Sequence, residues 1–299
     1  MNSQTNKLGK PISSWLIASR PKTLPAALAP VLTGSALAFH QNQFDAAIFI
    51  MICIAALFIQ IGTNFSNDLH DFLKGTDTDD RLGPLRATQA GLLTPSQMKS
   101  GIVTAFFIAL LAGCYLAYVG GWIIVVIGLT SFAAGLAYTA GPYPLGYHGW
   151  GDVFVFLYFG LIAVGGTFYL YTGTVNGEVI LIGAAMGGLS TAILIVNNLR
   201  DAGTDIHTGK RTLAVRLGEN FARGEYILCV TFPFVVSGLL YSRWDYPLGV
   251  FLTWFSLPLA INLIVSVFRD TGTDLNITLG KTARFLMIYS ILLVLGLIL

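Results

Sequence analysis

The sequence predicts an all-α integral membrane protein with nine transmembrane helices around a central cavity, and two observations support this fold class. Hydrophobic residues make up 55% of the 299 positions, whereas charged residues make up only 11%. Several apolar runs reach the roughly 18–20 residues that an α-helix needs to cross a bilayer. A transmembrane β-barrel would instead show short segments of alternating hydrophobicity. We therefore interpret residues 1–299 as one polytopic domain, surrounded by membrane lipid and without a nucleic-acid partner.

The chain begins with a polar or interfacial lead-in over residues 1–19, in which Trp15 is typical of a membrane interface. The prolines of RPKTLP then set the entry into the first span. Apolar periodicity and length predict nine spans. They cover residues 23–41, 46–66, 101–119, 121–139, 152–172, 178–198, 224–242, 247–267 and 282–299.

The basic residues predict the orientation of these spans. With the N-terminus placed in the cytoplasm, sixteen of the 17 Lys and Arg residues fall on the cytoplasmic side, and Arg243 is the exception. This asymmetry follows the positive-inside rule and requires an odd number of spans. The connections on the outer side are minimal (a Gly-Gly pair, TGTVNG and SRWDYP), whereas those on the inner side are long and polar. Because long loops usually carry function, we expect a site at the cytoplasmic face of a bacterial inner or plasma membrane.

An acidic element follows the second span, over residues 64–86. It holds five of the 15 carboxylates: Asp68, Asp71, Asp77, Asp79 and Asp80. On a helix that continues the span, Asn64, Asp68 and Asp71 stand at i, i+4 and i+7 and share one face. The remaining acids come after Gly75, which can end that helix. Negative charge at the end of a membrane helix is costly unless cations compensate it. A solvated acidic loop between two spans is the alternative interpretation.

A second acidic element, over residues 197–218, follows the sixth span. Asn198, Asp201 and Asp205 stand at i, i+3 and i+7, so one helical face can present all three. Asn197 precedes Asp201 by four residues. The order of an amide, spaced carboxylates and a basic loop repeats that of the first element. A capped helix end with solvated charges is the alternative for this element alone.

Together the two elements predict a diphosphate site. Mg²⁺ takes oxygen ligands and usually binds one or two carboxylates together with the phosphate oxygens of a substrate. Two opposed acidic faces suit such a cofactor. Basic side chains at the rim can neutralise the remaining phosphate charge. These are Lys22, Lys74, Arg81, Arg86, Lys210 and Arg211.

Four stretches resemble the UbiA superfamily of membrane prenyltransferases. They are RPKTLPAALAPVLTG (20–34), NFSNDLHDFLKGTDTDDRLGPLRATQAGLLT (64–94), YTAGPYPLGYHGWGD (138–152) and NNLRDAGTDIHTGKRTLAVRLG (197–218). The pair DDRLGPLR and GKRTLAVRLG is similar to the branch that prenylates 1,4-dihydroxy-2-naphthoate. The resemblance implies nine helices and two Asp-rich motifs that hold a prenyl diphosphate through magnesium.

Carried over residue by residue, the resemblance implies a metal-binding set, whose four carboxylates are also the catalytic candidates. This set comprises Asn64, Asp68, Asp71, Asp201 and Asp205. It also implies substrate-binding roles for Asn64 and for residues around that set. These fall on Arg20, Lys22, Lys74, Asp77, Asp80, Arg81, Arg86, Asn198, Lys210 and Arg211. Tyr138 and the PYPLGY loop match a region near the aromatic acceptor.

The implied reaction transfers a polyprenyl or phytyl group from its diphosphate to 1,4-dihydroxy-2-naphthoate. Carbon dioxide and diphosphate are lost, and a demethylmenaquinol or demethylphylloquinol is formed. Two alternatives remain open at this point. The acceptor could be another compound used in the superfamily, such as 4-hydroxybenzoate or homogentisate. From a different class, the chain could be a cation-coupled transporter, although transporters place broken helices and acids near the bilayer midplane.

Overall fold

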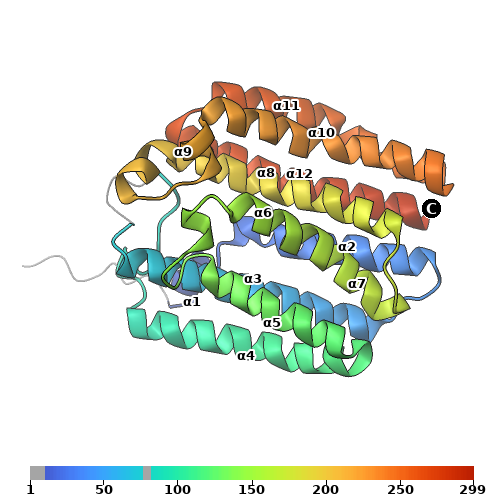
Figure 1. Ribbon diagram of the computed structural model, residues 1–299, viewed down its shortest axis with the longest axis horizontal. Coiled ribbons are helices and arrows are strands. Elements are labelled where there is room, and N and C mark those ends of the chain that lie inside the picture. Colours follow the sequence, from blue (N-terminus) through green and yellow to red (C-terminus); the bar gives the residue numbers. More distant parts are fainter. Residues whose placement is uncertain (1–10, 77–81) are drawn as a thin grey trace, which may run out of the picture.

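The computed structural model describes residues 11–76 and 82–299, and every regular element in these two segments is helical. The predicted site residues Asp77, Asp80 and Arg81, together with Asp79, lie outside the described residues. Most of the long helices run side by side along the bundle (Figure 1). The polar connections that carry α1 (Pro11–Ser19) and α9 (Leu213–Leu217) gather at one end of it.

The predicted spans all coincide with helical segments. Seven of the segments are single helices, namely α2 (Pro25–His40), α3 (Ala46–Leu73), α4 (Pro95–Gly120), α5 (Trp122–Ala137), α8 (Gly177–Thr208), α10 (Glu219–Trp244) and α12 (Leu275–Ile298). The other two segments are composite. One joins α6 (Gly151–Phe156), the π-helical turn η3 (Leu157–Ile162) and α7 (Ala163–Thr172), and the other joins the 3-10 segment η4 (Leu248–Ser256) to α11 (Leu257–Arg269). Short 3-10 turns form η1 (Pro21–Thr23), η2 (Leu145–Tyr147) and η5 (Gly272–Asp274).

Length and composition separate the segments that could cross a membrane from one that is too short. Within the described residues, 7 helices are long and apolar enough to cross a membrane, and the number is 8 when the bent pair Ile12–Thr23 and Pro25–His40 counts as one span. The helix α5 is apolar but has only 16 residues. At 1.5 Å per residue it covers about 24 Å, less than the ~30 Å hydrocarbon core. The protein is thus an all-helical membrane protein with seven or eight candidate spans.

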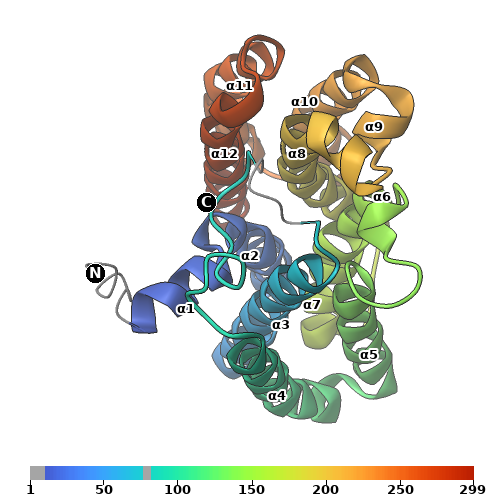
Figure 2. The ribbon, with the colours of Figure 1, turned by 90° about the vertical axis from the view of Figure 1, so that its left-hand side faces the viewer.

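The helices form three groups that both ribbon views separate. The group α8, α10, α11 and α12 lies on one side, the group α3, α4 and α5 on the other, and α2, α6 and α7 between them (Figure 2). Contacts of α2 with α12, α7 and α3 join the groups. The largest core cluster lies around α8, where Ile182, Met186 and Leu189 are fully buried.

Glycine permits one especially close helix contact, between the π-helical turn η3 and α8. A Cβ atom added to Gly160 would lie 2.4 Å from the carbonyl oxygen of Gly183 and 2.5 Å from the Cα atom of Gly187. Small residues at four-residue spacing allow such backbone approach in membrane proteins. The turn therefore packs directly on the backbone of α8.

Both acidic elements lie on helices that extend past their predicted spans. The helix α3 continues from the predicted end at 66 to Leu73, and α8 continues from 198 to Thr208. Gly209, with φ at +78°, then ends α8 in the left-handed conformation that glycine adopts readily. Both helix ends lie at the end of the bundle that carries α1 and α9 (Figure 1). Asp68, Asp71, Asp201 and Asp205 are therefore carried by helices at one end of the molecule.

Candidate functional site

A cavity of about 490 Å³ runs between the two acidic helix ends and continues among the apolar helices. Side chains of α3 line its polar end from one side, and side chains of α8 line it from the other. The first group contains Asn64, Asn67 and Asp71, and the second contains Asn197, Asn198, Asp201 and Asp205. The structure thus brings five predicted site residues of these helices to one cavity, together with Lys210 from the loop after α8. The five are Asn64, Asp71, Asn198, Asp201 and Asp205.

The rest of the cavity is apolar and is lined mainly by α4, α5 and the segment from α6 to α7. Three of its lining residues, Leu110, Val125 and Leu129, are also 46%, 45% and 61% exposed. These residues lie on α4 and α5, in a part of the bundle rich in exposed apolar side chains. The cavity therefore joins a polar end to an apolar region that contains exposed side chains.

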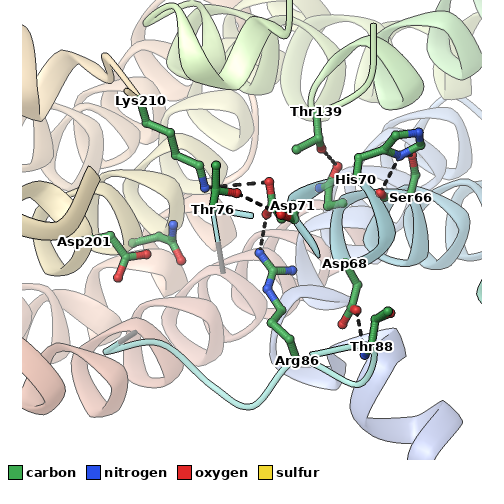
Figure 3. A network of polar contacts seen from close by, with 12 residues as sticks. Ser66, Asp68, His70, Asp71, Thr76, Arg86, Thr88, Thr139, Asp201 and Lys210 are labelled. Atoms are coloured by element: carbon green, nitrogen blue, oxygen red, sulfur yellow. Dashed lines mark hydrogen bonds and ion pairs between the residues drawn. The ribbon is translucent and has the colours of Figure 1, made fainter. Parts of the chain in front are cut away.

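Asp71 is the centre of the polar network on α3. Its carboxylate accepts a hydrogen bond from an Nη atom of Arg86 at 2.7 Å and one from the hydroxyl of Tyr147 at 2.7 Å. The Nζ atom of Lys210, from the connection after α8, lies 3.7 Å from the same carboxylate (Figure 3). Asp71 is buried, so these partners compensate a charge that water does not reach. Two cations of the predicted rim therefore converge on one carboxylate.

Asp201, on α8, is paired with its own neighbour in the chain. The guanidinium of Arg200 donates two hydrogen bonds to the Asp201 carboxylate, at 2.8 and 2.6 Å. It also donates to the side-chain oxygens of Asn197 and Asn276, each at 2.8 Å. Such a two-pronged pair fixes both side chains. The sequence analysis did not include Arg200 or Asn197 in the site, although Asn197 precedes Arg200 by three residues on the same helix.

Asp68 has a different environment from the other predicted carboxylates. It is buried, and its two oxygens accept hydrogen bonds from the backbone N–H groups of Ala87 and Thr88 at 2.9 and 3.0 Å. These groups lie in the segment that directly follows Arg86 (Figure 3). Asp68 is absent from the cavity lining, whereas Asn64 is part of it. The side chain of Asp68 thus holds the loop that brings Arg86 to Asp71.

The remaining predicted residues divide by their distance from the cavity. Arg20, Arg86 and Tyr138 line it. Lys22 and Arg211 are exposed and stand outside the lining. The structure therefore brings part of the predicted basic rim to the site.

Lys74 lies beside the cavity rather than in its lining. Its Nζ atom donates a 2.6 Å hydrogen bond to the carbonyl oxygen of Thr139. Although the side chain is largely exposed, burial of the ammonium lowers the pKa of Lys74. The carboxylate of Asp71 opposes this pKa shift, whereas the ammonium of Lys210 adds to it. The two lysines are therefore close enough to interact.

The donor set at the polar end suits a divalent cation that brings ligands with it. Carboxylate and amide oxygens from α3 and α8 are the ligand types that Mg²⁺ takes. Within the part of the chain that the structure describes, no three Asp, Glu, His or Cys side chains group closely enough to hold a metal by themselves. A cation here would need further oxygens, such as those of a diphosphate. Asp71, Asp201 and Asp205 are the carboxylates that face the cavity.

The fold and the site define a helical membrane protein whose cavity combines a polar, oxygen-rich end with an apolar end. Residues 27–278 match the UbiA prenyltransferase family. The chain therefore belongs to the UbiA prenyltransferase family, and it is a prenyltransferase.

Individual relatives agree with this family over nearly the whole chain. The chain is 36% identical to the 1,4-dihydroxy-2-naphthoate octaprenyltransferase of Escherichia coli, over 96% of this chain and 95% of that protein. It is 33% identical to the enzyme of the same name from Haemophilus influenzae, over 97% of each chain. The activity in these names is the activity of the relatives.

Solved structures support the fold. The apo structure of a UbiA homolog from Aeropyrum pernix K1 superposes with a TM-score of 0.70 at 14% identity, over 90% of this chain and 96% of that one. A UbiA homolog from Archaeoglobus fulgidus bound to DMAPP and Mg²⁺ gives a TM-score of 0.65 at 14% identity, over 94% and 99% of the two chains. At this identity the likeness concerns the fold alone.

Proposed function

We propose that this protein transfers a polyprenyl group from its diphosphate to 1,4-dihydroxy-2-naphthoate in menaquinone biosynthesis. One observation carries the proposal: Asp71 of α3 and Asp201 and Asp205 of α8 face one cavity whose remaining walls are mainly apolar. Such a cavity matches a substrate with a diphosphate head and a hydrocarbon chain. The relatives named for this reaction extend over almost the entire chain and support the choice of acceptor.

The polar end would bind the diphosphate and its metal. Mg²⁺, when bound, would neutralise the diphosphate and stabilise its charge as it leaves. Asp71, Asp201 and Asp205 are the carboxylates we assign to hold it, with Asn67 and Asn198 as amide oxygens beside them. Arg86 and Lys210, which pair with or approach Asp71 in this structure, would turn to the phosphate oxygens. The sequence analysis did not include Asn67, which precedes Asp71 by four residues on the same helical face.

The apolar walls would protect the reacting carbon. As the bond between this carbon and the diphosphate oxygen breaks, the allylic carbon becomes cationic and the electron pair leaves with diphosphate. The aromatic rings of Tyr138, Phe154 and Tyr158 line the cavity and can stabilise a cation through their faces. Apolar side chains around them exclude water, which would otherwise capture the cation.

The acceptor completes the exchange of bonds. The ring carbon that bears the carboxylate attacks the allylic carbon, and the neighbouring ring hydroxyl loses its proton to become a ketone. The carboxylate then lies beta to this ketone, so carbon dioxide leaves and its electron pair restores the aromatic ring. The ring oxygen regains a proton, which gives the demethylmenaquinol.

We also propose nine spans with a cytoplasmic N-terminus in a bacterial inner membrane. The short helix α5 would be the ninth span, in a locally thinned bilayer. The excess of Lys and Arg at the end of the bundle that carries the site supports a cytoplasmic active site.

The test is a transfer assay on the purified full-length protein with one prenyl diphosphate and a panel of acceptors. We expect product with 1,4-dihydroxy-2-naphthoate, loss of turnover in excess EDTA and recovery with Mg²⁺. Product with 4-hydroxybenzoate or homogentisate alone would overturn the assignment of the acceptor. Full turnover in excess chelator would overturn the role of the metal.

A further inference from the structure

The aromatic ring of Tyr147 lies close to two ammonium groups at the polar end of the cavity. The Nζ atom of Lys74 is 4.9 Å from the ring centroid, and the Nζ atom of Lys210 is 4.8 Å from it. Both distances are within the range of a cation–π interaction. Tyr147 itself lines the cavity.

The hydroxyl of Tyr147 makes a second set of contacts. It donates to the carboxylate of Asp71 at 2.7 Å and lies 2.9 Å from the hydroxyl of Thr76. Asp71 also bonds Arg86 at 2.7 Å, so Tyr147 and Arg86 hold this carboxylate from two directions. Hydrogen bonds of this kind orient carboxylates that bind metals.

Tyr147 also joins three segments that are distant in the sequence. It lies in the turn Leu145–Tyr147 between α5 and α6, and its hydroxyl reaches the end of α3. Its carbonyl oxygen accepts a 2.7 Å hydrogen bond from the backbone N–H of Arg211, in the connection after α8. Its side chain also contacts that connection through the ammonium of Lys210, so a change at this side chain affects both halves of the acidic site.

Two ammonium groups near one another repel, and an aromatic ring close to both offers attraction to each without adding a negative charge. A second carboxylate in the same place, beside that of Asp71 at 3.7 Å from Lys210, would compete with a phosphate for the two lysines. The ring thus helps to hold both lysines without a further anion.

We propose that Tyr147 is a positioning residue for the prenyl diphosphate: its ring holds Lys74 and Lys210 beside the acidic end, and its hydroxyl orients Asp71. The inference rests on the proposed function and deepens it. It differs from the resemblance, which places the PYPLGY loop near the aromatic acceptor. Tyr147 acts on the diphosphate side.

The experiment compares Tyr147→Leu, which removes both ring and hydroxyl, with Tyr147→Phe, which removes the hydroxyl alone. Full-length variants in lipid nanodiscs are titrated with inorganic pyrophosphate in the presence of Mg²⁺, and steady-state kinetics give KM for each substrate. We expect Tyr147→Leu to weaken pyrophosphate binding and raise the KM for prenyl diphosphate about tenfold or more, with an acceptor KM within about twofold of wild type. Tyr147→Phe should bind pyrophosphate within about threefold of wild type and lose kcat.

Phe268→Leu is the matched control. Phe268 lies 5.8 Å from the guanidinium carbon of Arg223 in a cation–π contact away from the cavity. This variant should leave pyrophosphate binding and both KM values unchanged.

Thermal melting of each variant is measured first. Tyr147→Phe keeps the ring, so it tests the inference even where Tyr147→Leu does not fold. A wild-type kcat in Tyr147→Phe, or a loss of pyrophosphate affinity as large as that of Tyr147→Leu, contradicts the inference. A Tyr147→Leu effect confined to the acceptor KM overturns it. If the wild-type protein prenylates a different acceptor, the proposed function fails, while the pyrophosphate titration still tests Tyr147.

Discussion

Substitution of a carboxylate that faces the cavity should lower the transfer rate, whereas substitution of one outside the cavity should not. Asp71 and Asp201 lie on opposite sides of the polar end, on α3 and α8. We expect Asp71→Asn and Asp201→Asn each to reduce the transfer rate about 10²-fold or more, the scale of losing one preorganised electrostatic group. The double variant should fall well short of the product of the two losses, because groups that act as a unit are not additive.

Glu219→Gln is the control for this pair of variants. Its exposed carboxylate bonds Arg223 at 2.9 Å away from the cavity, and its removal should leave the rate unchanged. The amounts of folded protein are compared before the rates. Near-wild-type turnover in folded Asp201→Asn would confine the chemistry to the α3 side.

We expect Asp68 to act by stabilising the loop that contains Ala87 and Thr88. Asp68→Ala would leave the buried N–H groups of Ala87 and Thr88 without their carboxylate acceptor. The expected cost is about 1–3 kcal/mol of stability, visible as a lower melting temperature. The Mg²⁺ concentration for half-maximal rate should change little. An unchanged melting temperature with a raised Mg²⁺ requirement would restore Asp68 to the metal-binding set.

These residues also show how far sequence reasoning reached within the site. Helical spacing predicted two acidic faces, and in the structure Asn64 and Asp71 line one side of the cavity and Asp201 and Asp205 the other. The same spacing grouped Asp68 with them, because a helical face is broad and spacing does not reveal which loop folds against it. Tyr147 reaches Asp71 across 76 positions of the chain. No local pattern encodes such a contact.

At the scale of helices, the contact between η3 and α8 should be the least tolerant of added volume. In Gly160→Ala the new methyl group would meet backbone atoms of Gly183 and Gly187 rather than flexible side chains. We expect a loss of about 1–3 kcal/mol, the usual cost of overpacking, measured as a lower melting temperature in detergent.

Gly238→Ala on α10 is the control, since nothing lies within 4 Å of its added Cβ atom. Alanine also favours the helix over glycine. This variant should be neutral or slightly more stable than wild type. Equal melting temperatures for the two alanine variants would show that η3 and α8 can separate without cost.

The positions of the helices were predictable, but their ends were less so. Apolar length placed all nine segments, because a membrane span needs a long apolar run. It underestimated α3 and α8, which continue as polar helices to Leu73 and Thr208. Hydropathy shows where the apolar run ends. The helix ends only where the backbone leaves the helical conformation, as it does at Gly209.

At the scale of the whole molecule, the uneven distribution of basic residues predicts one orientation. In a variant lacking Cys53, Cys114 and Cys229, single cysteines at positions 74 and 243 should label differently in intact cells. Position 243 should react with a membrane-impermeant reagent, and position 74 should react only after the cells are opened. Equal labelling at both positions would contradict the orientation.

The exposure of Leu110, Val125 and Leu129 at the cavity wall has a kinetic consequence for the proposed reaction. A donor and a product with long hydrocarbon chains would arrive and leave within the plane of the bilayer. Saturation of the enzyme would then depend on the mole fraction of donor among the lipids and would not depend on the volume of buffer. Diluting vesicles with buffer should leave the rate per enzyme unchanged, whereas adding inert phospholipid to the same vesicles should lower it.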